Sequence, residues 1–183
     1  MGAGVGAVSD YPPALWVPAD PSNYHAGPRP AYSLIVIHCS DGRAMAEPVA
    51  RMWQVPRHGS SAHFVIGQDA TVIQCVRLAD TAWHAHSVNG ASVGIEHCAR
   101  TPGELGPTDS GLPPSPQQYT ASARLVAWLC RRGGLQPSRD VIKGHAEADA
   151  KTTHTRCPDG CGWDWDRYMA LVQDEYNAWN GWV

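Results

Sequence analysis

The sequence has little of what would take a protein to nucleic acid or into a membrane. Its 183 residues carry 14 Lys+Arg against 17 Asp+Glu, a formal net charge of -3, so the basic excess that binds a phosphate backbone is missing. Lysine occurs only at Lys143 and Lys151, and the arginines are scattered, with Arg131-Arg132 the sole adjacent pair, which excludes a polybasic membrane anchor. No apolar run approaches the ~20 residues that a membrane-spanning helix needs. We therefore expect neither a nucleic-acid partner nor membrane insertion.

An export signal is also missing from the start of the sequence. Residues 1–20 have no charged n-region and no uninterrupted apolar run, both of which a secretory signal peptide requires. Without export, the six cysteines are expected to be reduced thiols, buried or bound to metal. Disulfides among them stay open as the alternative.

Composition divides the chain near Ala31. Residues 1–30 hold six of the 15 prolines and no periodic apolar pattern, which predicts an extended N-terminal arm or a linker. Residues 31–183 are expected to form a single domain, because a chain that is 43% hydrophobic and 17% charged is typical of one globular unit.

Short apolar runs alternate with helical patterns through this domain. Strands are predicted at 33–39, 93–98 and 141–144, with a hairpin at 62–66 and 71–76. Helices are predicted at 44–54, at 116–132, and at the C-terminus through Trp165, Tyr168, Met169, Val172, Tyr176 and Trp179. The alternation predicts an α/β domain with a mixed central β-sheet flanked by helices.

Three residues near the ends of these elements could bind one metal ion. His38 lies at the end of an apolar strand and His145 directly follows one, and a strand end fixes a side chain more rigidly than a loop does. Cys157 lies in the loop after His145. Two imidazoles and a thiolate form the ligand set of a catalytic zinc site with an open fourth position. Alternatively, the histidines are structural residues held by hydrogen bonds and the cysteine is a small apolar residue.

Four blocks of the sequence carry a family resemblance: IVIHCSDG, AHFVIGQDATVIQCV, DTAWHAHSVNGASVGIEH and KGHAEADAKTTHTRCP. In this order they resemble the zinc-dependent type 2 N-acetylmuramoyl-L-alanine amidases, a family that includes bacteriophage endolysins and the peptidoglycan recognition proteins. The resemblance covers about residues 33–168, and four blocks in order are far more specific than any one of them. It implies an amidase or peptidoglycan recognition protein-like fold for the catalytic domain.

The resemblance also implies which residues bind zinc. By position in the blocks, His38, His145 and Cys157 match the metal ligands of the family. The segment between His145 and Cys157 is longer than the usual family spacing. His154 and Asp159 therefore stay open as the third ligand.

Three further residues receive catalytic roles from the resemblance. Glu96 matches the acid/base carboxylate of some branches, and could take a proton from water and return it to the departing amine. His84 matches a histidine near the substrate, and Thr155 stands where some branches have a lysine and others a threonine. Either His84 or Thr155 would donate a hydrogen bond to the tetrahedral oxyanion.

The resemblance implies a peptidoglycan hydrolase that cleaves the amide bond between N-acetylmuramic acid and the L-alanine of the stem peptide. Zinc would lower the pKa of bound water from 15.7 towards ~7 and so allow hydrolysis at neutral pH. The missing signal peptide favours a phage endolysin, and the protein is expected to be a monomer. Such a protein stays in the host cytoplasm until a pore-forming protein releases it to the cell wall.

Two alternatives come from other patterns in the sequence. The run Gly90 to Gly94 fits the G-x-S-x-G pattern of serine hydrolases with Ser92 as nucleophile, but that pattern requires a helix after the serine, and a strand is predicted there. A closed structural zinc site could instead form from His145, His154, Cys157 and Cys161. The chain would then be a non-catalytic peptidoglycan-binding module.

Overall fold

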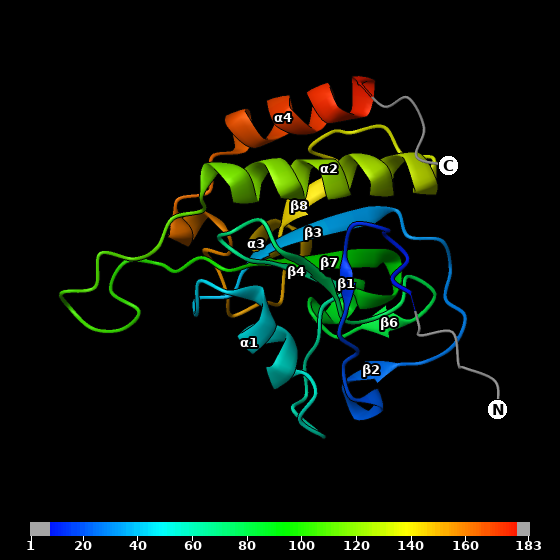
Figure 1. Cartoon of the computed structure of the whole chain (residues 1–183), viewed down its shortest axis with the longest axis horizontal. Helices are drawn as coiled ribbons and strands as arrows, with labels where there is room; N and C mark the ends of the chain where they lie inside the picture. The colour runs from blue at the N-terminus through cyan, green and yellow to red at the C-terminus, as the bar shows by residue number, and fades with distance from the viewer. Residues whose placement is uncertain (1–7, 179–183) are drawn as a thin grey trace.

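A six-stranded mixed β-sheet forms the centre of the computed structural model, which describes residues 8–178 (Figure 1). Its strands are β1 (Leu15–Trp16), β3 (Leu34–Cys39), β4 (Phe64–Ile66), β5 (Val72–Gln74), β7 (Ser92–His97) and β8 (Ile142–Gly144). They lie in the order β1-β5-β4-β7-β3-β8. The predicted hairpin is confirmed as the antiparallel pair β4–β5, and the other neighbouring strands of this sheet run parallel.

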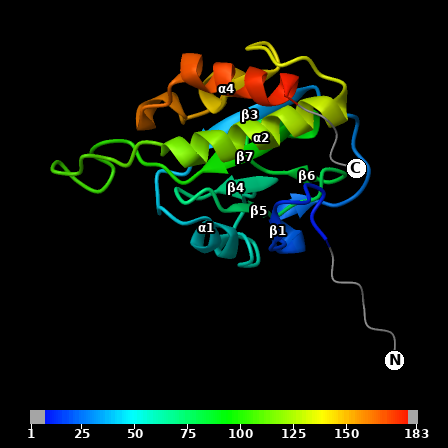
Figure 2. The same cartoon turned by 45° about the horizontal axis from the view of Figure 1, so that its top comes forward.

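Two helices cover one face of the sheet. α2 (Pro116–Gly133) lies on the strands and α4 (Trp165–Asn177) packs against α2 (Figure 2). The Ser115 hydroxyl caps α2 by accepting from the Gln118 amide at 3.1 Å, and Gly134 ends it at φ 65, in the left-handed region that glycine tolerates. The apolar face of α2 buries Leu125 and Leu129 against the sheet.

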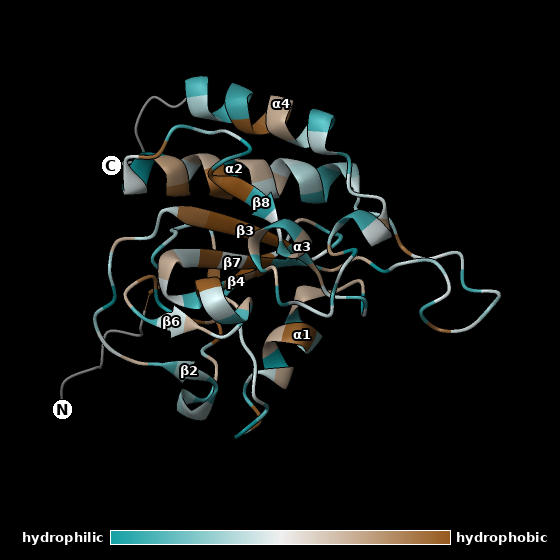
Figure 3. Ribbon diagram, turned by 180° about the vertical axis from the view of Figure 1, so that it is seen from behind, coloured by the Kyte–Doolittle hydropathy of each residue, from teal (hydrophilic) through white to brown (hydrophobic). Residues whose placement is uncertain are grey.

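Alternation along the strands sends different side chains to the two faces. On β3, Ile35 and Ile37 belong to the core under α2, so the residues between and after them project to the other side. There α1 (Ala46–Met52) packs against β4 and β5 in a second, smaller core. Figure 3 shows the apolar strands between these layers. The expected mixed sheet with flanking helices is confirmed.

The segment before Ala31 differs from the expected arm or linker. β1 extends the central sheet beside β5, and β2 (Tyr24–His25) pairs antiparallel with β6 (Thr81–Ala82). Tyr11, Ala14 and Ala19 are buried. The packed unit therefore begins before Ala31. Strand pairs of two residues and single buried side chains need no periodic apolar pattern, so this segment has none in the sequence.

The remaining elements follow the predicted order. The predicted strands and the helices at 44–54 and 116–132 are confirmed within a few residues, and α3 (His145–Ala148) adds one short turn after β8. The C-terminal helix is confirmed as α4, while Trp179 lies outside the described residues. Within residues 8–178, no helix combines the length and apolar character needed to span a bilayer.

Candidate active site

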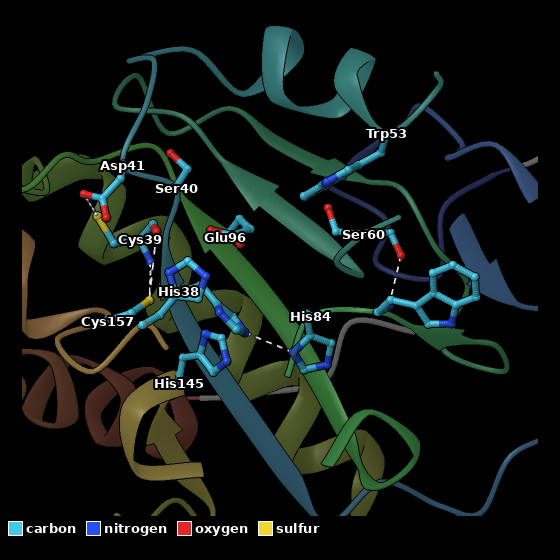
Figure 4. Close-up of a pocket in the computed structure, with 13 residues that line it drawn as sticks. His38, Cys39, Ser40, Asp41, Trp53, Ser60, His84, Glu96, His145 and Cys157 are labelled. Atoms are coloured by element: carbon cyan, nitrogen blue, oxygen red, sulfur yellow. Dashed lines mark hydrogen bonds between the residues drawn. The ribbon is translucent and has the colours of Figure 1, made fainter. Parts of the chain in front are cut away.

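A cavity of about 210 Å³ opens where β3, β7 and β8 end (Figure 4). These strands are parallel, so their carboxyl ends meet at one edge of the sheet. β3 contributes His38, β7 contributes Glu96, and His145 is the first residue of α3 after β8. The cavity is lined by His38, Cys39, Ser40, Asp41, Trp53, Ser60, Ser61, Trp83, His84, Glu96, His145, His154 and Cys157.

The three expected metal ligands converge in this cavity. Each of His38, His145 and Cys157 offers one possible metal-ligand atom, and these three atoms lie within 4.8 Å of one another. The Cys39 amide donates to the Cys157 sulfur at 3.3 Å and so orients it. Nε2 of His145 is buried without a hydrogen bond to any residue of 8–178, 3.8 Å from an Asp149 carboxylate oxygen. Two imidazoles and one sulfur suit zinc in its catalytic arrangement, so these residues fit the metal.

Burial sets the protonation of the metal-binding side chains. It holds the pKa of His38 well below its usual value, with the neighbouring His84 and His145 lowering it further. His38 is therefore neutral at neutral pH, the form that binds metal. Burial also raises the pKa of the Cys157 thiol, with Glu96 as the next cause. A divalent cation overcomes such a shift, because a coordinating thiol is deprotonated.

Glu96 is a half-buried residue whose carboxyl group lines the same cavity. It is the direct register partner of His38 on the neighbouring parallel strand, so both side chains leave the sheet on the same face. Burial, and secondarily the charge of Asp41, raises its pKa to about 8. Its Oε2 is buried without a hydrogen-bond partner within residues 8–178. A carboxyl group that titrates near neutrality in a cleft is suited to proton transfer.

His84 lines the cavity with both ring nitrogens engaged. Nδ1 lies 3.0 Å from Nε2 of His38, and Nε2 lies 3.1 Å from the hydroxyl oxygen of Ser92. Both ring nitrogens of His84 are thus engaged within the protein. The resemblance, in contrast, implied a ring N–H free to donate a hydrogen bond to the oxyanion.

The other candidate residues lie around the metal-binding group. The His154 ring stacks on His145 with centroids 5.5 Å apart and lines the cavity, but His154 is outside the three-residue donor group. Asp159 accepts a hydrogen bond from the Trp165 indole at 2.8 Å. Thr155 is exposed and lines an adjoining cavity of about 250 Å³. Cys157 is therefore the third ligand that the geometry supports.

The two alternative sites from the sequence are not assembled. Ser92 is fully buried at the first position of β7, and its hydroxyl donates to the Val88 carbonyl at 2.7 Å. It is followed by a strand, so the turn and helix of a serine hydrolase are absent here. Cys161 is buried with its sulfur 2.9 Å from the Pro158 carbonyl, and among residues 8–178 it does not join the His145 and Cys157 group.

Sequence reasoning missed one wall of the cavity. Trp53, from the turn after α1, and Trp83 stand there with Ser60 and Ser61. Trp83 could have been found, since it directly precedes His84 in one of the quoted blocks. Trp53 carries no such signal, because only the packing of α1 brings it to the cavity.

Comparison with known proteins now identifies the family. The model of the N-acetylmuramoyl-L-alanine amidase family matches residues 27–160, a range that contains His38, His145, Cys157 and Glu96. The chain belongs to this family. The resemblance seen in the sequence is therefore confirmed, and the amidase acts on the bacterial cell wall.

Individual relatives agree with the family. N-acetylmuramoyl-L-alanine amidase A of Achromobacter lyticus is 29% identical over 180 residues, covering 89% of this chain and 95% of that protein. A mutant endolysin from Bacillus subtilis superposes with a TM-score of 0.67 at 22% identity, covering 87% of this chain and 97% of that one. An AmpD crystal structure has a TM-score of 0.60 at 26% identity, covering 91% and 99%. The amidase thus shares its fold with endolysins.

Proposed function

We propose that the amidase hydrolyses the amide bond between the lactyl group of N-acetylmuramic acid and L-alanine with a zinc ion held by His38, His145 and Cys157. The observation that carries this is the convergence of those three side chains in the cavity that Glu96 also lines. A zinc ion bound there would polarise the scissile carbonyl and lower the pKa of a water molecule. The open side of the cavity leaves room for substrate.

Glu96 moves the proton in this reaction. Its carboxylate accepts a proton from the attacking water as the new carbon–oxygen bond forms. When the carbon–nitrogen bond breaks, the carboxyl group returns the proton to the amine of L-alanine. A zinc ion held by the three ligands would favour the carboxylate form that starts the cycle, whereas burial favours the acid.

Thr155 is the proposed oxyanion donor of the two that the sequence offered. Its hydroxyl is exposed in the adjoining cavity, which shares Cys157 and His154 with the main one. In contrast, both nitrogens of His84 are occupied. A donor placed beside the reacting carbonyl stabilises the charge that develops there.

We also propose that the amidase works as a monomeric endolysin, held in the host cytoplasm until its release to the wall. The endolysin fold supports this origin. The bacterial relative favours a second candidate, a bacterium's own wall-processing amidase. Producing the chain inside Escherichia coli with and without a pore-forming phage protein separates the two, since an endolysin lyses the cells only when the pore is present. Sedimentation of the purified chain would test the monomer.

The experiment for the activity uses purified peptidoglycan and defined muropeptides. Zinc-loaded protein should release new L-alanine amino termini, a chelator should stop the release, and added zinc should restore it. His38→Ala should lose both zinc and activity. Wild-type protein that binds zinc and peptidoglycan but releases no amino termini would establish the non-catalytic binding module instead.

A further inference from the structure

A chain of hydrogen bonds leads from the candidate metal site into the sheet. It runs from the His38 ring to the His84 ring at 3.0 Å, and from His84 to the Ser92 hydroxyl at 3.1 Å. The Ser92 hydroxyl in turn lies 2.7 Å from the Val88 carbonyl. His38, His84 and Ser92 are here named the histidine relay.

The direction of each bond follows from its far end. A carbonyl only accepts, so the single Ser92 hydroxyl proton goes to Val88, and the serine oxygen must accept from Nε2–H of His84. Nε2 of His38 is engaged by His84, so only Nδ1 of His38 is left to face a metal ion. A neutral His38 that binds through the Nδ1 lone pair keeps its ring proton on Nε2 and donates it to Nδ1 of His84. His84 then carries its own ring proton on Nε2, which agrees with the bond to Ser92.

The fold makes room for His84 at this place. A Cβ at Gly94 would lie 2.4 Å from Cγ of the His84 ring, so only glycine allows the ring to sit against β7. The Asn89 side-chain oxygen accepts from the backbone amides of His84 at 3.0 Å and Ala85 at 2.7 Å. These contacts give Ser92 and Gly94 of the G-x-S-x-G pattern a role in placing an imidazole.

We propose that His84 and Ser92 are positioning residues that hold His38 as the Nε2-protonated tautomer, with Nδ1 presented to the metal. The inference rests on the proposed zinc site. Metal-binding histidines generally donate their other N–H to a fixed acceptor, and loss of that acceptor costs about 10-fold to 100-fold in metal affinity. Here the acceptor is a second histidine, whose own tautomer is fixed by a buried serine.

The first test needs no substitution. In the zinc-loaded full chain, long-range proton–nitrogen correlation spectra should show the His38 ring protonated at Nε2 and His84 protonated at Nε2 as well. A proton on Nδ1 of His84 would reverse the bond to His38 and overturn the proposal.

The second test measures zinc affinity by competition with a chromophoric chelator. His84→Phe keeps a ring against Gly94 but removes the acceptor, and should weaken zinc binding about 10-fold to 100-fold. His84→Gln offers a side-chain oxygen to His38 and should restore part of that loss. Ser92→Ala should weaken binding less than His84→Phe, because it removes only the outer bond.

A matched control is a buried histidine that touches His38 elsewhere. Nδ1–H of His97 donates to the backbone carbonyl of His38 at 3.0 Å and does not bond to its ring. His97→Gln should therefore lower the melting temperature and leave zinc affinity near the wild-type value, in contrast to His84→Phe. Equal weakening in both variants, or wild-type affinity in His84→Phe, overturns the proposal. Wild-type protein that binds no zinc would instead refute the proposed metal site.

Discussion

His38 and Glu96 are paired across two neighbouring parallel strands. Because directly opposed residues of a sheet point to the same face, this register places the proposed metal ligand and the proposed proton-transfer group beside each other. The apolar residues that fix the positions of β3 and β7 therefore also fix the positions of these two side chains.

Removing the Glu96 carboxylate should separate catalysis from metal binding. Glu96→Gln keeps the shape of the side chain and cannot accept the proton, so kcat should fall about 10²-fold to 10⁴-fold. Zinc affinity should stay near the wild-type value, since Glu96 is not one of the three converging donors. Amine release and chelator competition on one protein batch measure both. Unchanged kcat would show that Glu96 does not transfer the proton.

The raised pKa of Glu96 predicts a pH dependence of stability in metal-free protein. Its pKa rises from an ordinary 4.5 to about 8 on folding, so the unfolded state releases its proton first as pH increases. The contribution of Glu96 to stability should therefore be constant below pH 4.5 and decrease between pH 4.5 and about pH 8, by at most about 1.4 kcal/mol per pH unit. Thermal unfolding of Glu96→Gln should show a higher melting temperature than wild type at pH 7.5 and little difference at pH 4.5. A constant difference at both pH values would contradict the assignment.

Two cysteines four positions apart should behave differently. Cys157→Ala removes a proposed ligand, so it should lose zinc and amidase activity. Cys161→Ala is the matched control, because that thiol is buried in the same small cluster without belonging to the donor group. It should keep zinc, with a loss of stability only. Metal analysis after gel filtration distinguishes them, and loss of zinc in both Cys157→Ala and Cys161→Ala would favour the closed structural site.

Two glycines of one motif should also differ. Gly94→Ala forces its Cβ to 2.4 Å from the His84 ring, whereas a Cβ at Gly90 meets no atom within 4 Å. Overpacking of this kind costs about 1–3 kcal/mol, so urea unfolding should show that loss for Gly94→Ala. Gly90→Ala should unfold close to wild type. Similar midpoints for all three proteins would mean that His84 does not pack against Gly94.

Deleting residues 1–30 tests whether the N-terminal segment belongs to the folded unit. The truncated chain loses β1 from the edge of the sheet and the buried Tyr11, Ala14 and Ala19. Its melting temperature should fall by several degrees, since about 1 kcal/mol corresponds to about 2–4 °C in a chain of this size. An unchanged melting temperature would restore the view of this segment as a linker.

The sequence predicted those parts of the fold and site that depend on local pattern. Apolar β-branched runs located β3 and β7, and the Ser115 cap with the Gly133–Gly134 stop located α2. The order of family blocks pointed to the three side chains that converge in the cavity. These signals need only neighbouring residues.

Other features depend on contacts that no local pattern records. Trp53 reaches the cavity only through the packing of α1, and β1 joins the sheet through two residues. His84 was expected to face the substrate, yet its two bonds depend on where β3 and β7 place His38 and Ser92. Such relationships between distant residues required the three-dimensional structure.

The most direct test of the account is zinc K-edge X-ray absorption of the zinc-loaded chain. The account predicts one sulfur at about 2.3 Å and two imidazole nitrogens at about 2.0 Å, with a further oxygen ligand from solvent. Two sulfur ligands, or four protein ligands with no oxygen, would contradict it.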